Sequence, residues 1–374
     1  MKRIIKILFV FISFAIITSS CEHYYNPGLN VKTINEDSIT LPENQILMEY
    51  IKNTGDYINT LGVPNMVSAE DVNENLSDYF VIDTRLHDDY VEGHINGAVN
   101  VKMNNLINYF EKNIVPAIYD KIVLVCYSGQ SSSYATSILR LLGYNNVYAM
   151  KYGMGSWNRT FDDWSKNISN KYANALETKN NPKGRKYNLP EIKTGKQCGA
   201  EILKERAKEA LNIPFYKLIV KADKAFADSN FYIINYWPKD KYLKGHIPGA
   251  IQYTPKHDLS DTTFLNTLPT DKNILVYCFT GQNAAFTIAY LRLLGYKAFT
   301  LGFGANSFMH DVLVSREHWH GFKPAEKLHD FPLIKGEKPS NKKINTATNT
   351  NNSSPKPKKK LIKRKKKEVT GGCG

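Results

Sequence analysis

Short, unbroken apolar runs alternate with stretches of helical periodicity along most of this chain. Residues 79–82 and 122–125 are wholly apolar, and residues 147–150 form a further run of this kind. Residues 131–142 carry apolar side chains at helical spacing and stop at Gly143. Continuous apolar strands that alternate with helices are typical of a parallel sheet with helices on both faces. The pattern therefore predicts an α/β fold.

The same pattern occurs a second time. Residues 93–98 (Gly-His-Ile-Asn-Gly-Ala) return as residues 245–250 (Gly-His-Ile-Pro-Gly-Ala), 152 positions later, and Cys126 returns as Cys278 at the same offset. The second copy repeats the predicted strands at 231–234, 274–277 and 298–301, and the helix at 284–294. From about residue 66 to 144 the copies align without a gap, and beyond it residues 153–155 align with 302–304 at an offset of 149. A repeat of this length is a domain, which predicts a tandem duplication.

The repeat sets the predicted domain boundaries. The first domain covers residues 46–165 and the second covers residues 196–333, each with its own parallel sheet and flanking helices. Residues 166–195, rich in Asn, Lys and Gly, are predicted to link them. Residues 334–374 are predicted to be a disordered, Lys-rich tail that ends in Gly-Gly-Cys-Gly.

The amino-terminal residues have the composition of an export signal. Lys2, Arg3 and Lys6 precede an apolar stretch at 7–17 that is too short to span a bilayer, so residues 1–20 are predicted to be a signal peptide. Cys21 follows at once and resembles the acylated cysteine of a bacterial lipoprotein, although Thr18 stands where that motif usually has Leu. The resemblance implies an exported chain, held by a lipid anchor on the membrane at the periplasmic side or cell envelope, with residues 21–45 as a tether. The alternatives are plain secretion and an uncleaved anchor.

The charge of the chain is concentrated at its two ends. Its 49 Lys and Arg and 35 Asp and Glu give a formal net charge of +14. Three of the basic residues lie in the predicted signal peptide, and residues 335–374 hold 13 basic and two acidic residues, so the duplicated body is neutral. This distribution argues against nucleic-acid binding by the folded part.

Two cysteines stand at equivalent strand ends, each before a short polar loop and a helix. Ligands bind at the carboxyl ends of parallel strands, and a helix amino terminus directs several backbone N–H groups at one point. A thiol held there has its thiolate stabilised and becomes a nucleophile for an anionic substrate. The alternative is a buried cysteine that serves only packing. The predicted site residues are Cys126 with Tyr127, Ser128, Gly129, Gln130 and Ser131, and Cys278 with Phe279, Thr280, Gly281, Gln282 and Asn283.

Together these motifs resemble the rhodanese, or sulfurtransferase, family. Its hallmarks are an Asp-x-Arg after an early strand, a Gly-His-Ile-x-Gly-Ala segment, and a cysteine that opens a loop between strand and helix. The first copy has all three, with Asp83 and Arg85 forming the first motif, whereas the second copy reads Asn235-Tyr236-Trp237 at that position. The resemblance covers residues 46–165 and 196–333.

The resemblance implies a sulfurtransferase. A cysteine thiolate takes sulfane sulfur from a small donor, such as thiosulfate, a polysulfide or a persulfide, and passes it as a cysteine persulfide to a thiol or to cyanide. The resemblance implies no metal and no organic cofactor. It also assigns a structural ion pair to Asp83 and Arg85, and a positioning role to His94 and His246. Many members carry Arg directly after the cysteine, where this chain has Tyr127 and Phe279, which weakens the expectation of a doubly charged donor.

Two other functions compete with this one. A cysteine-dependent phosphatase or arsenate reductase needs Arg six positions after the cysteine, where this chain has Ser132 and Ala284, so that chemistry is not expected. The second alternative is a rhodanese-like module that binds sulfide species or a partner protein without turnover.

Two further cysteines lie outside the loops. Cys198 precedes a predicted helix at residues 200–211 and is either a second reactive thiol or a packing residue. Cys373 stands at the end of the Lys-rich tail. We expect it either to accept the sulfur or to belong to a tail that binds an anionic surface.

Overall fold

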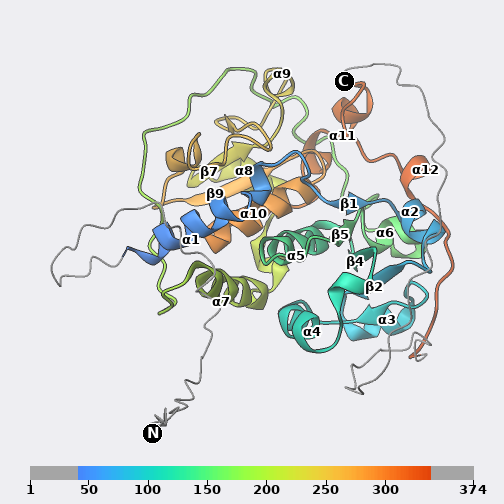
Figure 1. Ribbon diagram of the computed structural model, residues 1–374. Coiled ribbons are helices and arrows are strands. Elements are labelled where there is room, and N and C mark those ends of the chain that lie inside the picture. Colours follow the sequence, from blue (N-terminus) through green and yellow to red (C-terminus); the bar gives the residue numbers. More distant parts are fainter. Residues whose placement is uncertain (1–40, 338–374) are drawn as a thin grey trace, which may run out of the picture. The chain divides into compact units, whose positions relative to one another are not determined.

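Two five-stranded parallel sheets form the framework of the computed structural model, which describes residues 41–337 (Figure 1). The strands of the first sheet are β1 (Met66–Val67), β2 (Tyr79–Asp83), β3 (Val99–Asn100), β4 (Lys121–Val125) and β5 (Val147–Met150). Those of the second are β6 (Ile219–Val220), β7 (Phe231–Asn235), β8 (Ile251–Gln252), β9 (Asn273–Tyr277) and β10 (Ala298–Leu301). The strand orders are β1-β5-β4-β2-β3 and β6-β10-β9-β7-β8, so the two sheets have the same topology.

Helices connect and cover these strands. In the first half of the chain they are α1 (Glu43–Asn53), α2 (Ala69–Glu74), α3 (His87–Glu92), α4 (Leu106–Lys112), α5 (Gln130–Leu141) and α6 (Met154–Trp157). In the second half they are α7 (Gly199–Asn212), α8 (Ala222–Ala227), α9 (Lys239–Tyr242), α10 (Gln282–Leu293), α11 (Asn306–Val314) and α12 (Pro324–Lys327). Short 3₁₀ turns complete the chain, at Tyr57–Asn59, Met103–Asn105, Pro116–Ile118, Arg159–Phe161, Phe215–Leu218 and Leu265–Thr267.

Both faces of the first sheet are buried, which is why its strands are apolar without alternation. Val81 and Val123 pack with side chains of α2, α3 and α6. Ile82 and Leu124 point to the other face and pack in a second cluster with α4 and α5. Since neighbouring residues of a strand point to opposite faces, each strand needs an apolar residue at every position. The predicted α/β class, with two tandem domains that each have a parallel sheet and flanking helices, is confirmed.

The two halves correspond less simply than their sequences suggested. Tyr152 and Gly153 have positive φ values of 62° and 63°, and Phe303 and Gly304 have φ values of 57° and 58°. The equivalent residues are therefore 151 positions apart, and the alignment of residues 153–155 with 302–304 was wrong. The alignment failed because it matched two glycines by spacing, whereas the conserved geometry is a left-handed pair after the last strand.

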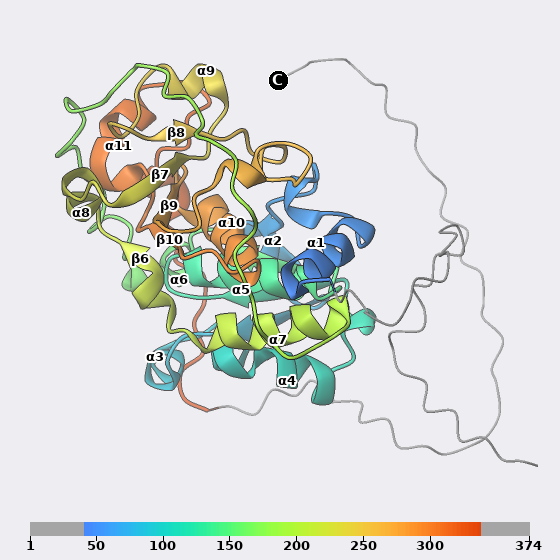
Figure 2. The same ribbon diagram turned by 90° about the vertical axis from the view of Figure 1, so that its left-hand side faces the viewer.

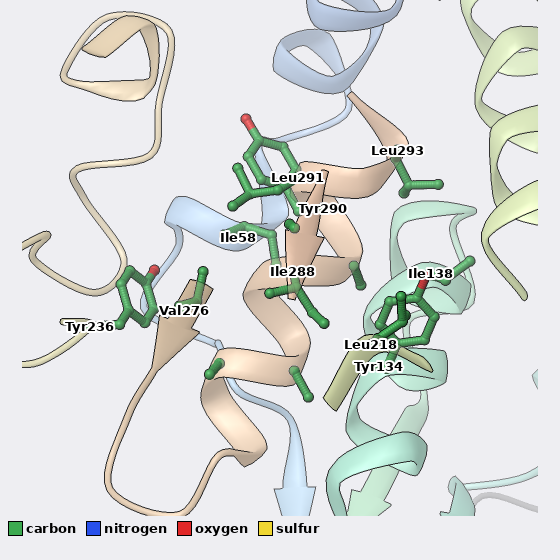
Figure 3. Packing of buried hydrophobic residues seen from close by; sticks show 14 of the residues in the cluster. Ile58, Tyr134, Ile138, Leu218, Tyr236, Val276, Ile288, Tyr290, Leu291 and Leu293 are labelled. Atoms are coloured by element: carbon green, nitrogen blue, oxygen red, sulfur yellow. The ribbon is translucent and has the colours of Figure 1, made fainter. Parts of the chain in front are cut away.

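The domains share the larger of the two hydrophobic clusters. Helix α5 packs against α10, as Figures 1 and 2 both show. Ile138 of α5 and Ile288 of α10 belong to the same buried cluster, part of which Figure 3 shows. The Ser137 hydroxyl donates to the backbone oxygen of Phe286 across this contact, at 2.9 Å. This cluster therefore joins side chains of both domains across the contact between α5 and α10.

Each domain is also covered by a segment that follows the other domain. The linker arm, residues 166–195, leaves the first domain, and its Glu177 exchanges backbone hydrogen bonds of 2.9 Å with His246 of the second. The carboxyl-terminal arm, residues 328–337, leaves the second domain and returns to the first (Figure 1). There Ile334 exchanges backbone hydrogen bonds of 3.0 and 2.9 Å with His94. The two Gly-His-Ile segments are thus covered by exchanged arms.

The helices that lead into the domains are exchanged in the same way. Lys52 of α1, which precedes the first sheet, forms an ion pair of 3.1 Å with Asp261 of the second domain. Lys204 of α7, which precedes the second sheet, forms one of 2.7 Å with Glu111 of the first domain. The Tyr134 hydroxyl of α5 also donates to the backbone oxygen of Ala210 in α7, at 3.2 Å.

Several sequence-based predictions lie outside the described residues. These are the signal peptide, Cys21, most of the tether, Cys373 and nearly all of the Lys-rich tail. The last tether residues, 43–45, belong to α1, and residues 334–337 of the predicted tail belong to the carboxyl-terminal arm. Within residues 41–337, no helix is long and apolar enough to cross a membrane.

Candidate active site

The loop between β4 and α5 surrounds Cys126 with hydrogen-bond donors. Cys126 is 1% exposed, and its Sγ accepts hydrogen bonds from the N–H groups of Gly129 at 3.2 Å and Ser132 at 3.3 Å. The thiol in turn donates to the Ser132 hydroxyl oxygen at 3.3 Å. These N–H groups belong to the amino terminus of α5, where the helix dipole adds positive potential. The backbone of the loop can therefore hold negative charge on the sulfur without a change of its conformation.

Backbone contacts fix the shape of this loop. Gly129 has φ 85° and ends the loop directly before α5, so the helix begins at Gln130, one residue earlier than predicted. The Met154 N–H donates to the Cys126 oxygen at 2.8 Å, and the Gly155 N–H donates to the Tyr127 oxygen at 3.1 Å. The turn after β5, which leads into α6, thus anchors the backbone of the cysteine loop. Ser128 and Ser131 are half-buried in the loop and at the start of α5.

The second cysteine occupies the same position after β9. Cys278 is 4% exposed, and its Sγ accepts a hydrogen bond from the Ala284 N–H at 3.4 Å. Burial raises the pKa of the Cys278 thiol, while the N–H groups of Ala284, Thr280, Gly281 and Asn283 act to lower it. The Ala305 N–H donates to the Cys278 oxygen at 3.0 Å, as Met154 does in the first domain.

The first residues of α5 and α10 tie the two cysteine loops together. The Gln130 amide nitrogen donates to the Leu301 oxygen at 3.1 Å, and its amide oxygen accepts from the Phe303 N–H at 2.9 Å. Gln282 of the second domain makes the equivalent bond to the first domain, because its amide oxygen accepts from the Tyr152 N–H at 2.9 Å. Each glutamine therefore reaches the turn that supports the other loop.

Close packing at this junction explains the two loop glycines. A Cβ at Gly129 would collide with the Gln282 side chain, and a Cβ at Gly281 would collide with that of Gln130. Both glycines also have positive φ, of 85° and 73°. Glycine is therefore required at each position both by the lack of space for a Cβ and by the positive φ.

Asp83 and Arg85 form a buried ion pair at the end of β2, where Asp83 lies beside Val125, the residue that precedes Cys126. The guanidinium makes two hydrogen bonds of 3.1 Å and one of 2.7 Å to the Asp83 carboxylate, and one of 2.6 Å to the Gly93 oxygen. In the second domain the Asn235 amide instead donates to the Tyr277 hydroxyl at 2.8 Å, and the Ile247 N–H donates to the same hydroxyl at 3.0 Å. A neutral network thus replaces the ion pair and still holds the Gly-His-Ile segment.

The histidines of the two Gly-His-Ile segments lie in matching aromatic sites. His94 stacks on Tyr90 with ring centroids 3.8 Å apart, and its Nδ1 lies 2.8 Å from the Tyr90 oxygen. His246 stacks on Tyr242 at 3.7 Å, and its Nδ1 lies 2.8 Å from the Tyr242 oxygen. Burial lowers the pKa of both imidazoles, which favours their neutral form. Their contacts are those of groups that fix a turn.

The residue after each cysteine makes the two site entrances different. Tyr127 is 36% exposed; its hydroxyl donates to the Asp89 carboxylate and accepts from the Leu86 N–H at 3.1 Å. Burial and the bond to Asp89 raise the pKa of Tyr127 to about 12, so its hydroxyl stays protonated. Phe279 is only 8% exposed, because it stacks on Trp237 at 4.5 Å and contacts Trp319 at 5.6 Å.

A pocket of about 330 Å³ lies between the domains beside Phe279. It is lined by Glu70, Lys151 and Tyr152 of the first domain and by Trp319, His320, Lys323, Glu326 and Lys327 of the second. His320 contacts the Phe279 ring at 5.4 Å. Burial, and to a smaller extent the nearby Lys241, Lys151, His318 and Lys327, lower the pKa of His320.

The structure adds residues that the sequence analysis did not single out. These are Tyr152 and Trp319, which shape the second site together with Trp237. Gln130 and Gln282 were predicted as loop residues, but the sequence did not show that each of them bonds the other domain. Cys198 directly precedes α7 and lies in neither loop, whereas the free thiols of the described chain are Cys126 and Cys278.

Comparison with known proteins identifies relatives of both halves. The sequence profile of the rhodanese-like domain matches residues 68–160 and 219–310. Thiosulfate sulfurtransferase GlpE of Shewanella oneidensis is 35% identical over 78 residues, which are 21% of this chain and 73% of that protein. The GlpE protein of Coxiella burnetii is 37% identical over 81 residues, covering 21% of this chain and 72% of its own length. Each relative therefore corresponds in length to a single domain.

Solved structures show similarity at lower identity. A rhodanese-related protein from Thermoplasma volcanium is 25% identical, with a TM-score of 0.22, over 25% of this chain and 89% of its own. A thiosulfate sulfurtransferase from Pseudomonas aeruginosa is 14% identical, with a TM-score of 0.23, over 77% of this chain and 69% of its own.

Proposed function

Because this chain belongs to the rhodanese-like family, we propose that it is a sulfurtransferase that moves sulfane sulfur through a persulfide on Cys126, with Cys278 as a second site. The observation that carries the proposal is the cradle around Cys126. Two N–H groups at the start of α5 donate to its sulfur, and the turn after β5 anchors its backbone. Donors aimed at a sulfur in this way stabilise a thiolate more than a neutral thiol.

Sulfur transfer then takes two displacement steps. The Cys126 thiolate attacks the sulfane sulfur of the donor, the bond from that sulfur to the rest of the donor breaks, and the donor leaves with the electron pair. When the donor is thiosulfate, the leaving group is sulfite. An acceptor thiolate next attacks the outer sulfur of the persulfide, and the electron pair of the broken S–S bond returns to Cys126. The loop N–H groups stabilise negative charge on sulfur in both steps.

The entrances support different substrates at the two sites. The pocket beside Phe279 is lined by Lys151, Lys323 and Lys327 and by the acidic Glu70 and Glu326, and this small excess of positive charge favours a small anionic donor at Cys278. The entrance at Cys126 carries the exposed Leu86 and the Tyr127–Asp89 pair, which does not favour a doubly charged anion. We therefore propose polysulfide or persulfide donors, rather than thiosulfate, for Cys126.

Mass measurement on the intact protein tests this proposal. After incubation with thiosulfate or with polysulfide, we expect an adduct of about 32 Da, one sulfur atom, formed by thiolate attack. Cys126→Ser should remove the adduct formed from polysulfide, and Cys278→Ser should remove the one formed from thiosulfate. The two substitutions control for each other, since they make the same change at equivalent positions. An adduct with neither donor would contradict the enzyme and leave the non-catalytic binding module.

We also propose that the protein is exported and anchored through an acylated Cys21, because residues 1–21 have the sequence features of a lipoprotein signal. Cells that express the chain and are fed a labelled fatty acid should incorporate the label into the membrane fraction. Cys21→Ser should abolish the labelling. Labelling that survives this substitution would contradict the anchor.

A further inference from the structure

The two cysteine sites differ six residues after the cysteine, inside the first turn of the following helix. The first site has Ser132, which is fully buried and whose hydroxyl oxygen lies 3.3 Å from the Cys126 Sγ. The second site has Ala284 at the equivalent position, so only the backbone N–H contacts Cys278 there. The N–H contact is common to both sites, and the hydroxyl belongs to the first alone.

A second acceptor gives the Ser132 hydroxyl a choice of orientation. In the structure the Cys126 thiol donates to the Ser132 oxygen, and the Ser132 hydroxyl donates to the Gly129 oxygen at 3.2 Å. That oxygen also accepts from the Ser133 hydroxyl at 2.6 Å and from the Ser133 N–H at 3.2 Å. Gly129 therefore keeps two donors when the Ser132 hydroxyl turns away, so the rotation leaves no buried group unpaired.

We propose that Ser132 is a catalytic residue whose hydroxyl follows the charge on Cys126, accepting from the thiol and donating to the thiolate. The inference rests on the proposed sulfur transfer at Cys126. When the thiol loses its proton, the hydroxyl rotates from the Gly129 oxygen to the sulfur. When the persulfide gives up its outer sulfur, the returning electron pair on Sγ meets the same donor. The proton of Ser132 stays on its oxygen throughout, so the residue acts by hydrogen bonding and not as an acid or base.

This hydrogen bond makes Cys126 ionise more readily than Cys278. It also makes Cys126 the better leaving group when the persulfide gives up its outer sulfur. A hydrogen bond to a charged group is about twice as strong as one to a neutral group, so the hydroxyl favours the ionised sulfur. Cys278 lacks this donor, because Ala284 replaces Ser132 in the second site. The next residue also differs, since Ala285 stands where the first site has Ser133. The two cysteines therefore differ in how strongly their thiolates are stabilised, because only the first site has the Ser132 hydroxyl. This difference adds to that between the two entrances.

Alkylation of the thiols as a function of pH tests this role without requiring turnover. The protein is treated with iodoacetamide over a range of pH, and the peptides that carry Cys126 and Cys278 are quantified separately by mass spectrometry. Ser132→Ala should move the midpoint of the Cys126 alkylation curve to higher pH by about one unit, a tenfold loss of thiolate at a given pH. The Cys278 curve, measured in the same sample, should not move.

A matched control and the converse substitution complete the design. Thr136 lies on the same helix, is fully buried, and has no hydrogen-bond partner for its hydroxyl within the described residues, so Thr136→Val should leave the Cys126 curve in place. Ala284→Ser supplies the missing hydroxyl at the second site and should move the Cys278 curve to lower pH. An unchanged Cys126 curve in Ser132→Ala, or an equal shift in Thr136→Val, would overturn the proposal. Because alkylation needs no sulfur donor, failure here is distinct from failure to form a persulfide.

Discussion

Replacing Gln130 with alanine removes the side chain that joins the first cysteine loop to the second domain. Gln130 is 1% exposed, and its amide bonds the Leu301 oxygen and the Phe303 N–H. After the substitution the Leu301 oxygen keeps another donor, the Gly304 N–H at 3.1 Å. The Phe303 N–H loses its partner. The change therefore leaves one half-buried donor unpaired and removes one further hydrogen bond.

These two effects set the expected loss of stability. An unpaired buried N–H group costs about 1–3 kcal/mol, and a lost hydrogen bond whose acceptor keeps a partner costs about 0.5–1.5 kcal/mol. The free energy of unfolding should therefore fall by about 2–4 kcal/mol in Gln130→Ala. Gln282→Ala removes the partner of the Tyr152 N–H alone, so it should cost less, about 1–3 kcal/mol.

Urea unfolding followed by circular dichroism measures both losses. The wild-type chain should unfold in one transition, because α5 and α10 lie in a common core, and the variants should shift its midpoint without changing its slope. Gln197→Ala is the control, because Gln197 is an exposed glutamine outside the junction. A loss in Gln130→Ala no larger than in this control would refute the role given to the cross-domain amide.

Three further predictions concern the ion pair, the histidines and the exchanged arms. Arg85→Ala leaves the Asp83 carboxylate buried without its cation and should lower the free energy of unfolding by about 3–5 kcal/mol; a loss in urea unfolding similar to that of exposed substitutions would contradict this. Burial lowers the pKa of His94 and of His246, so below about pH 6.5 the unfolded chain binds protons that the folded chain excludes, and the free energy of unfolding should decrease as the pH falls. Urea titrations across this range should show a shallower decrease in a His94→Gln, His246→Gln double variant, and an equal slope would show that other groups are responsible. A fragment of residues 46–165 lacks the carboxyl-terminal arm and α7 and should give no cooperative unfolding transition by circular dichroism; a sharp transition would show that the first domain is independent.

Local sequence patterns were sufficient for the elements that carry the cysteines. The apolar run at 147–150 coincides with β5, and the run at 298–301 coincides with β10, because strands covered on both faces need apolar side chains throughout. The position of Cys126 after such a run was enough to predict a loop at the carboxyl end of the sheet. Periodicity was less accurate at helix starts, since Gln282 begins α10 two residues before the predicted helix.

Contacts between distant residues could not be predicted in this way. Gln130 and Phe303 are joined by a hydrogen bond, yet 173 positions separate them, and no local pattern encodes such a pair. The same holds for Ile334 on His94, in a segment assigned to a tail because it is rich in charge. The sequence shows that Trp237 stands at the position of Arg85. Only the structure shows that the Tyr277 hydroxyl replaces the hydrogen bonds of the missing ion pair.

The exchange of arms gives this chain the pattern that joining two swapped subunits end to end would produce. In a symmetric swapped dimer every substitution appears in both halves, so both sites must change together. Once the halves share a single chain, each can vary separately while the other continues to supply its arm. The pairs Asp83 and Asn235, Val125 and Tyr277, and Ser132 and Ala284 show such separate variation. Covalent fusion thus turns a duplicated site into two sites open to specialisation.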